Sequence, residues 1–306
     1  MKILVIGGTG FIGRHLCPFL AKDNQVSVMA RNPRDDNDSS RSESNISYVK
    51  GDITDRDQVF TAMEGMDYVV HLASSVIPST SNANPIFDVQ TNLVGALNIL
   101  DAALEHKIKK LVFISSGGTV YGEGAGKPFK EDDPTNPICS YGIVKLAIEK
   151  YIQMYHQLHG VPFAILRLSN PYGPGQLGEK PLGVISIFLD RIKREMPIEI
   201  WGDGSVSRDF IYIDDVLSAI SMAMLSPSKR LLLNIGSGKT VSLMDVVNTI
   251  SENIGKKPNI VFKLSRPFDV SNVYLDIEKT KKELGWSPNV GFLEGVSLTT
   301  FKQSKR

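Results

Sequence analysis

The stretch KILVIGGTGFIG at residues 2–13 decides the fold of this chain. Residues 2–6 form an aliphatic run after the leading lysine, which is typical of a strand buried on both faces. Glycines stand at positions 7, 10 and 13, and residues 14–21 are predicted to form a helix. Such a turn lets the backbone approach a pyrophosphate, whose charge the helix N-terminus stabilises. The pattern favours a dinucleotide site over a plain strand–helix turn, with contacts from Gly7, Gly10, Phe11, Ile12 and Gly13.

Strands and helices alternate beyond this turn. Further strands are predicted at 25–30, 46–50, 68–73, 111–114 and 163–168, with long helices at 88–106 and 141–159. This alternation predicts an α/β fold with a parallel, doubly wound sheet. The pattern breaks at residues 170–175, so we expect a dinucleotide-binding domain at 1–169 and a smaller, less regular α/β substrate domain at 170–306. Parts near 209–224 are expected to be able to pack back on the first domain.

Composition excludes several classes of protein. With 306 residues, 42% apolar residues and a formal net charge of +1, the chain has no long-range field for nucleic acid or an acidic membrane surface. No apolar run reaches membrane-spanning length, and no metal site is predicted. Two cysteines, Cys17 and Cys139, are too few for a disulfide framework and fit a reducing cytoplasm.

The end of the second predicted strand bears on whether the dinucleotide is NAD or NADP. A fold that prefers NAD usually ends this strand with an acid, but here Ala30 stands there, followed by Arg31 and then Arg34. This leans towards the 2′-phosphate of NADP, although Arg31 lying along the adenine edge is a nearly equal alternative. After the third strand, Asp52 and Ile53 are expected at the adenine, with Asp52 as a hydrogen-bond acceptor; the alternative for Asp52 is a helix N-terminal carboxylate.

Tyr141 and Lys145 are the candidate catalytic pair. Four residues apart, they lie on one face of a helix, where an ammonium near a phenol favours phenolate and lowers its pKa. Taken alone, the pair favours an ordinary amphipathic helix with an exposed lysine. The fifth strand, however, ends in a run rich in hydroxyls and glycine at residues 115–122, at the sheet edge where ligands bind. The fourth strand brings Leu72 and Ala73 past the same edge.

Taken together, these motifs resemble those of an extended short-chain dehydrogenase/reductase of the NAD-dependent epimerase/dehydratase family, whose core is a Rossmann domain. The resemblance spans nearly the whole chain. Its elements are the glycine turn, Gly51-Asp52, His71-Leu72-Ala73, Val120-Tyr121-Gly122, Tyr141/Lys145, residues 170–175, Arg208-Asp209, Arg266-Pro267 and Asp269-Val270.

The resemblance implies a role for each of these residues. Tyr141 would be the acid/base, and Lys145 would bind the nicotinamide ribose and lower the Tyr141 pKa. Asn92 and Ser115 would join the cofactor contacts. Asn170 and Arg208 would bind the diphosphate of a UDP- or dTDP-hexose, and Arg266 and Asp269 its phosphate and nucleoside side. A homodimer through helices 88–106 and 141–159, and a setting in cell-surface polysaccharide synthesis, are also implied.

One departure from the family separates possible reactions. The catalytic Ser or Thr three residues before Val-Tyr-Gly is replaced by Gly117, leaving Ser116 and Thr119 as substitutes. The Asp-Glu pair of the 4,6-dehydratases is replaced by Gly118-Thr119, which offers no acid for elimination. The leading hypothesis is therefore a nucleotide-sugar 4-epimerase acting through a transient 4-keto hexose. An NADPH-dependent 4-ketoreductase is the alternative, and a non-catalytic dinucleotide sensor is a third hypothesis.

Overall fold

The chain consists of two compact units. The computed structural model describes residues 1–33, 45–123, 126–176, 183–264 and 272–303. Unit 1 comprises Met1–Val120, Thr135–Arg167 and Leu217–Leu233. Unit 2 comprises Tyr121–Pro134, Leu168–Val216 and Asn234–Arg306.

Unit 1 is built on a seven-stranded sheet with the strand order β11-β6-β5-β4-β1-β2-β3. The β1–β2, β1–β4, β2–β3 and β4–β5 pairs are parallel, which confirms the predicted doubly wound α/β fold. Four strands match their predicted bounds, whereas β4 is shorter and β5 is longer. The strands are β1 (Lys2–Ile6), β2 (Gln25–Ala30), β3 (Ile46–Lys50), β4 (Tyr68–His71), β5 (Lys110–Ser116), β6 (Phe163–Leu168) and β11 (Arg230–Ile235).

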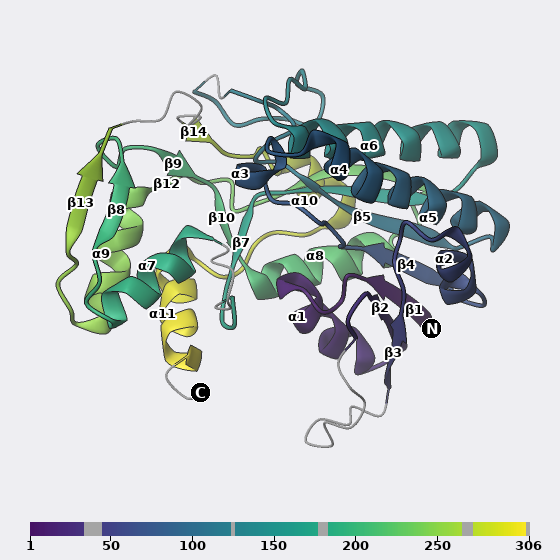
Figure 1. The fold of residues 1–306 in the computed structure, drawn as a ribbon, viewed down its shortest axis with the longest axis horizontal. Coiled ribbons are helices and arrows are strands. Elements are labelled where there is room, and N and C mark those ends of the chain that lie inside the picture. The colour runs from purple at the N-terminus through teal and green to yellow at the C-terminus, as the bar shows by residue number, and fades with distance from the viewer. Residues whose placement is uncertain (34–44, 124–125, 177–182, 265–271, 304–306) are drawn as a thin grey trace. The chain divides into compact units, whose positions relative to one another are not determined.

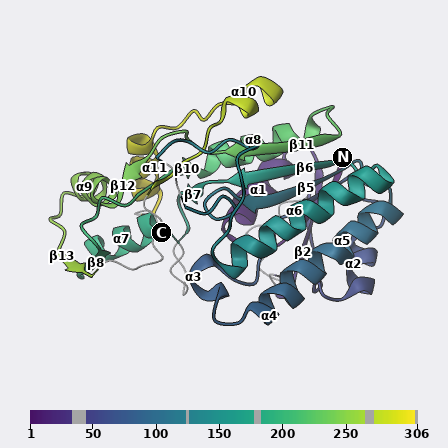
Figure 2. The same cartoon turned by 90° about the horizontal axis from the view of Figure 1, so that it is seen from above.

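Helices cover both faces of this sheet (Figures 1 and 2). Helices α2 (Arg56–Met63), α5 (Val94–Glu105) and α6 (Ser140–His159) lie over one face, and α1 (Phe11–Ala21) and α8 (Ile213–Leu225) over the other. Val144, Ile148 and Ile152 recur along α6 at helical spacing and pack into the core formed with α2, α5 and the strands. This packing fixes which face of α6 meets the carboxyl end of β5.

The helix predicted at 88–106 is confirmed, but it begins at residue 85 and contains a π-helical segment. The structure has α3 (Pro78–Ser81), α4 (Pro85–Asp88), a π-helix η2 (Val89–Leu93) and only then α5. A π-helical turn accommodates one extra residue, and such turns often occur at functional sites. Here the turn carries Asn92, whose side chain bonds Asp88 at the end of α4. Local polar bonds of this kind do not show in an apolar periodicity.

Unit 2 is a set of small sheets and helices. The strand β7 (Asn170–Tyr172) pairs with β10 (Phe210–Tyr212), β8 (Ile198–Trp201) with β13 (Ile260–Lys263), and β9 (Ser207–Arg208) with β12 (Val241–Ser242) and β14 (Asn272–Val273). The helices are α7 (Val184–Lys193), α9 (Leu243–Ile254), α10 (Glu278–Leu284) and α11 (Phe292–Gln303). Helix α9 packs against α7 and α11, begins with a Ser242–Asp245 capping box and ends at Gly255.

The chain passes between the units more often than one boundary at residue 169 would require. Residues 121–134 belong to unit 2, and residues 217–233 return to unit 1 and supply its seventh strand, β11. The sequence analysis did not identify β11 as a strand of this sheet. In the described part of the chain, no helix is both long and apolar enough to cross a membrane.

Candidate functional site

The glycine turn after β1 requires glycine at two positions. Gly7 has a φ of +84°, and a Cβ added to it would lie 2.7 Å from the backbone nitrogen of Ala73. A Cβ on Gly13 would lie 2.4 Å from the Cα of Gly8, so α1 packs directly on the turn. Leu72 N donates to the Ile6 carbonyl at 2.9 Å, which brings the chain after β4 beside the turn.

The start of α1 fits an anionic ligand. Its N-cap residue, Gly10, offers no side-chain bond to the first turn, and that turn contains no acidic residue. The first N–H groups of the helix, which include those of Phe11 and Ile12, therefore meet no capping side chain and no opposing charge. A backbone cradle closed to any Cβ, next to such a helix end, fits the pyrophosphate of a dinucleotide.

The two residues predicted at the adenine end differ in their surroundings. Arg31 is exposed and makes no hydrogen bond or ion pair with any residue the structure describes. Asp52 Oδ1 accepts bonds from Thr54 N and Thr54 Oγ1, both at 2.9 Å. Asp55 caps α2 instead, so the helix-cap alternative for Asp52 was wrong. Ile53 is 8% exposed and packs against Gly95, while Arg34 lies outside the described residues.

Tyr141 and Lys145 lie on consecutive turns of α6, facing the end of β5. Lys145 is 5% exposed, and its Nζ donates to the Ile114 carbonyl at 2.8 Å. The same Nζ lies 4.7 Å from the centre of the Phe113 ring and 5.6 Å from that of the Tyr141 ring. Ser116, at the end of β5, is near enough to the Tyr141 phenol to lower its pKa. Ammonium, phenol and hydroxyl therefore form one cluster.

Burial dominates the acidity of this cluster. It raises the pKa of Tyr141 to about 12, with smaller contributions in the same direction from Cys139 and Asp88, whereas the Ser116 side chain acts against the rise. Burial also lowers the pKa of Lys145 to about 8, against the effect of Asp88 and Glu149. The expected lowering of the Tyr141 pKa was wrong for this chain, because loss of hydration outweighs an ammonium that faces the ring and a carbonyl.

The two candidate substitutes for the missing hydroxyl at Gly117 are placed differently. Ser116 acts on the pKa of the Tyr141 phenol, whereas Thr119 Oγ1 is buried and has no hydrogen-bond partner in the described part of the chain. Thr119 packs against α6, since a Cβ on Gly142 would lie 3.0 Å from the Thr119 carbonyl oxygen. Of the two, only Ser116 acts on the predicted acid/base.

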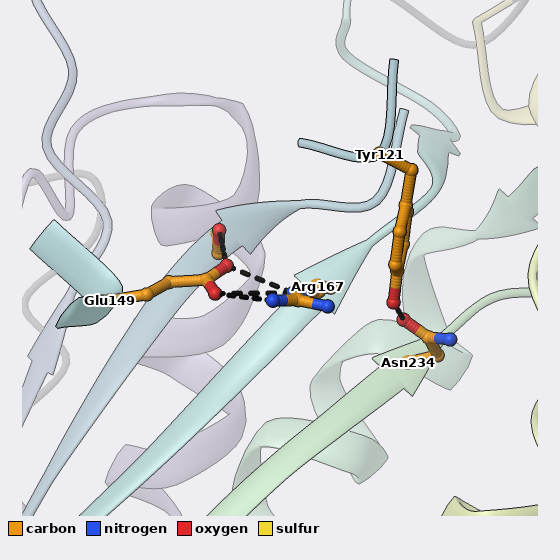
Figure 3. A network of polar contacts seen from close by, with 5 residues as sticks. Tyr121, Glu149, Arg167 and Asn234 are labelled. Carbon is orange, nitrogen blue, oxygen red and sulfur yellow. Dashed lines mark hydrogen bonds and ion pairs between the residues drawn. The ribbon is translucent and has the colours of Figure 1, made fainter. Parts of the chain in front are cut away.

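A buried ion pair lies behind the cluster, and the sequence analysis missed it. Figure 3 shows Arg167 of β6 forming a fork on Glu149 of α6, with Nη2–Oε2 at 2.7 Å and Nε–Oε1 at 3.1 Å. Ser115 Oγ donates to the same carboxylate, so this hydroxyl, predicted to bind the cofactor, faces the protein interior. Glu149 follows Lys145 by four residues, and that spacing was the available signal.

A second polar network holds the start of α6. Asp88 accepts bonds from Ser140 Oγ and Asn92 Nδ2, both at 2.8 Å, and Asn92 Oδ1 accepts from Ser75 N at 2.9 Å. Asn92 is 5% exposed, so both ends of its side chain are used within the protein. His71 is buried against Phe113, and burial lowers its pKa to about 3, which agrees with a packed, neutral histidine.

Unit 2 contains a pocket of about 490 Å³. Asn170 and Arg208 both line it; Asn170 Nδ2 donates to the Asp209 carbonyl at 2.9 Å, and Arg208 Nη1 to the Ser207 carbonyl at 2.8 Å. The aromatic residues Phe188 and Trp201 and a second arginine, Arg191, are further lining residues, which the sequence analysis did not assign. Planar apolar faces beside guanidinium groups suit a base attached to phosphates.

Neighbouring residues in unit 2 are structural. Asp209 is 1% exposed and accepts bonds from Ser237 and from the backbone of Leu275, so it is no surface partner of Arg208. Tyr121 of the Val-Tyr-Gly motif donates its hydroxyl hydrogen to Asn234 Oδ1 at 2.7 Å (Figure 3). Arg266 and Asp269, predicted to bind the nucleotide, lie outside the described residues.

Comparisons with known proteins agree with this arrangement. Residues 3–236 match the NAD dependent epimerase/dehydratase family. A Methanocaldococcus jannaschii protein, named provisionally as a UDP-glucose 4-epimerase, is 38% identical over 96% of this chain and 95% of its own. The dTDP-4-dehydro-6-deoxyglucose reductase of Escherichia coli is 32% identical, with 96% of this chain and 95% of that protein covered.

Solved structures give the same result. The UDP-glucose 4-epimerase of Thermotoga maritima, solved with UDP-glucose, superposes with a TM-score of 0.92 at 33% identity and covers 100% of this chain and 99% of that chain. The Thermus thermophilus UDP-glucose 4-epimerase complex with NAD has a TM-score of 0.88 at 31% identity and covers 99% of both chains. With a glycine cradle, a Tyr–Lys pair on α6 and these similarities, the chain belongs to the NAD dependent epimerase/dehydratase family.

Proposed function

We propose that the protein is a nucleotide-sugar 4-epimerase that uses a bound nicotinamide dinucleotide. One observation carries this proposal: the half-buried Tyr141 phenol and Ser116 hydroxyl lie with the buried Lys145 ammonium, and no carboxylate stands between residues 116 and 120. Epimerisation at a carbinol carbon needs one group that removes and returns a hydroxyl proton. Elimination of water needs a further acid, and Gly117, Gly118 and Thr119 supply none.

The glycine turn and α1 would hold the dinucleotide. Gly7 and Gly13 admit the pyrophosphate to the backbone, and the first turn of α1 meets its charge. When bound, the dinucleotide supplies reversible hydride acceptance. We favour NAD over NADP, because the Thermus thermophilus relative was solved with NAD.

The protein's own residues would manage the proton of the sugar 4-hydroxyl. Tyr141 Oη would take this proton and later return it to the opposite epimer. With its pKa at about 12, the free phenol holds its own proton at neutral pH, so groups that favour phenolate are needed. The Lys145 ammonium and the Ser116 hydroxyl would supply that help.

The pocket of unit 2 would take the nucleotide. Arg208 and Asn170 offer a guanidinium fork and an amide to a diphosphate, and Trp201 and Phe188 offer apolar faces to a base. We favour a uridine nucleotide, as in the Thermotoga maritima relative solved with UDP-glucose.

A cofactor-free assay tests the proposal. Purified protein incubated with UDP-glucose and no added dinucleotide should form the 4-epimer, detected by chromatography, because an epimerase regenerates its cofactor in each turnover. The Escherichia coli relative makes a 4-ketoreductase the second candidate. Consumption of NADPH with a 4-keto sugar nucleotide, together with no turnover without NADPH, would establish that candidate and overturn the first.

We also propose a homodimer through α5 and α6. Helix α6 leaves Ile143 54% and Leu158 65% exposed, and the α4–α5 segment leaves Ile86 70% and Val94 42% exposed. Exposed apolar side chains gathered on neighbouring helices are typical of a protein interface. Light scattering should give twice the 33.6 kDa chain mass, and Leu158→Lys should reduce that value. A wild-type mass of one chain would overturn the dimer.

Cytoplasmic action is part of the same proposal. Cys17 and Cys139 are both free thiols, as expected where thiols are kept reduced. An unchanged thermal midpoint after addition of a reductant would agree with this assignment.

A further inference from the structure

Asp88 is a fully buried carboxylate with no cationic partner among the described residues. Its exposed fraction is 0%, and no described lysine, arginine or histidine lies within ion-pair distance of it. Its two oxygens accept bonds from Ser140 Oγ and Asn92 Nδ2, each at 2.8 Å. Both partners are neutral donors, and an acceptor-only group suits an ionised carboxylate. Burying such a charge without a counter-ion is costly, so its retention calls for a physical reason.

Glu149 provides the contrast within the same helix environment. It is also 0% exposed, but the guanidinium of Arg167 neutralises it at 2.7 Å. At a distance, the charges of this pair largely cancel. The charge of Asp88 is not cancelled by any described ion pair, so its field reaches the neighbouring groups.

Those neighbours are the predicted catalytic residues. Ser140, which bonds Asp88, is the first residue of α6 and directly precedes Tyr141. The charge of Asp88 raises the pKa of Tyr141, and it opposes the burial that lowers the pKa of Lys145. On Lys145 its effect ranks ahead of that of Glu149, although Glu149 lies only four residues from Lys145.

We propose that Asp88 is the buried counter-charge of the Tyr141–Lys145 pair: a positioning residue that fixes the start of α6 through Ser140 and keeps the Lys145 ammonium charged without pairing with it directly. A direct ion pair would hold Nζ on the carboxylate. Placed at a distance, Asp88 leaves Nζ on the Ile114 carbonyl and beside the Tyr141 ring. The inference rests on the proposed function for its catalytic meaning, but the charge coupling itself needs no substrate.

Other charged or titratable side chains also act on Lys145. Glu149 on α6 adds negative charge, offset by Arg167 on β6, and His71 on β4 is neutral because burial lowers its pKa to about 3. Tyr141 itself, with a pKa of about 12, is uncharged at neutral pH. Asp88 is therefore the one uncompensated charge among the described groups that act on Lys145.

The test measures Lys145 directly in the full chain. Lysine labelled with ¹³C at Cε is incorporated, the Lys145 resonance is assigned by its loss in Lys145→Arg, and its midpoint is followed with pH. We expect a midpoint near 8 in the wild type. Asp88→Asn should lower it by roughly one pH unit, the low end of the shift that one nearby opposite charge produces.

Two controls separate charge from scaffold. Ser140→Ala removes a hydrogen bond to Asp88 but keeps its charge, so the Lys145 midpoint should stay near that of the wild type. Asp101→Asn removes a carboxylate of α5 that bonds Tyr155, and it should also leave the midpoint unchanged. If Asp88→Asn does not fold, Asp88→Ser is used in its place. Serine also carries no charge, and its hydroxyl can still form hydrogen bonds with the neighbouring side chains.

Two results would overturn the inference: an unchanged midpoint in a folded, neutral Asp88 variant, or an equal shift in Ser140→Ala. Neither result depends on turnover. A wild-type protein without epimerase activity would instead overturn the proposed function, and the titration would still decide whether Asp88 acts on Lys145. In an active enzyme, Asp88→Asn should also move the alkaline limb of the pH–rate profile to lower pH, because Lys145 would lose its proton earlier.

Discussion

The start of α6 and the pocket of unit 2 are built in opposite ways. Around α6, the catalytic candidates come from a long helix and a central strand, and the Lys145 ammonium among them is buried and bonded to a backbone carbonyl. In the pocket, Arg208 and Asn170 come from strands of two and three residues and are only half-buried. Proton transfer depends on acidities set by burial, whereas a diphosphate needs accessible guanidinium groups. The difference predicts that substitutions near α6 affect rate or folding, and that those in the pocket affect binding.

Removal of the phenol should give the largest effect. We expect Tyr141→Phe to lower turnover by about 10²- to 10⁴-fold, the usual contribution of a positioned acid/base, while dinucleotide binding and the thermal midpoint change little. Stopped-time product analysis measures the rate. Tyr151→Phe, on the exposed side of the same helix, is the matched control. Full turnover in Tyr141→Phe would remove Tyr141 from the mechanism.

Breaking the buried ion pair should come next. Glu149→Gln removes the carboxylate that neutralises Arg167 in the interior, and we expect a loss of about 3–5 kcal/mol in the free energy of unfolding, measured with urea. The control is Asp190→Asn, which breaks the exposed Asp190–Arg194 pair and should cost less than about 1 kcal/mol. Equal losses in the two variants would show that burial does not distinguish these pairs.

In the pocket, Arg208→Met should act on binding. Loss of charge-assisted hydrogen bonds to a diphosphate costs about 1.5–3 kcal/mol, so we expect KM for the nucleotide sugar to rise roughly 10- to 100-fold with a smaller change in kcat. Arg230→Met, at the exposed start of β11, controls for loss of a positive charge. A fall in kcat at unchanged KM would move Arg208 out of the binding role.

The hydroxyls at 116 and 119 should give the smallest effects. Ser116→Ala removes a hydroxyl that lowers the pKa of the phenol and should lower kcat about tenfold, roughly the value of one hydrogen bond. Thr119→Val keeps the shape and removes a buried hydroxyl that has no described partner, so the protein should become no less stable. A rate loss in Thr119→Val larger than that in Ser116→Ala would make Thr119 the main substitute for the missing serine.

Sequence patterns predicted the strands and the glycine turn better than they predicted the buried polar contacts. Apolar runs and glycines at fixed offsets identified six of the seven strands and the dinucleotide turn, because both depend on local spacing. They did not indicate that Arg167, within an apolar strand, pairs with Glu149, or that Asp88 is buried. The direction of the Tyr141 pKa was wrong for the same reason: hydration is lost through residues distant in the chain.

The return of residues 217–233 to unit 1 has a consequence for biosynthesis. Strand β11 pairs with β6 but is translated more than 60 residues after it. During synthesis, one edge of β6 therefore stays without a paired strand until β11 has been made. Helix α8 and β11 close that edge only when residues beyond 233 have emerged. Truncation at residue 169 would therefore leave an unfinished sheet with an apolar border prone to aggregation, although it keeps every glycine of the turn and both catalytic candidates.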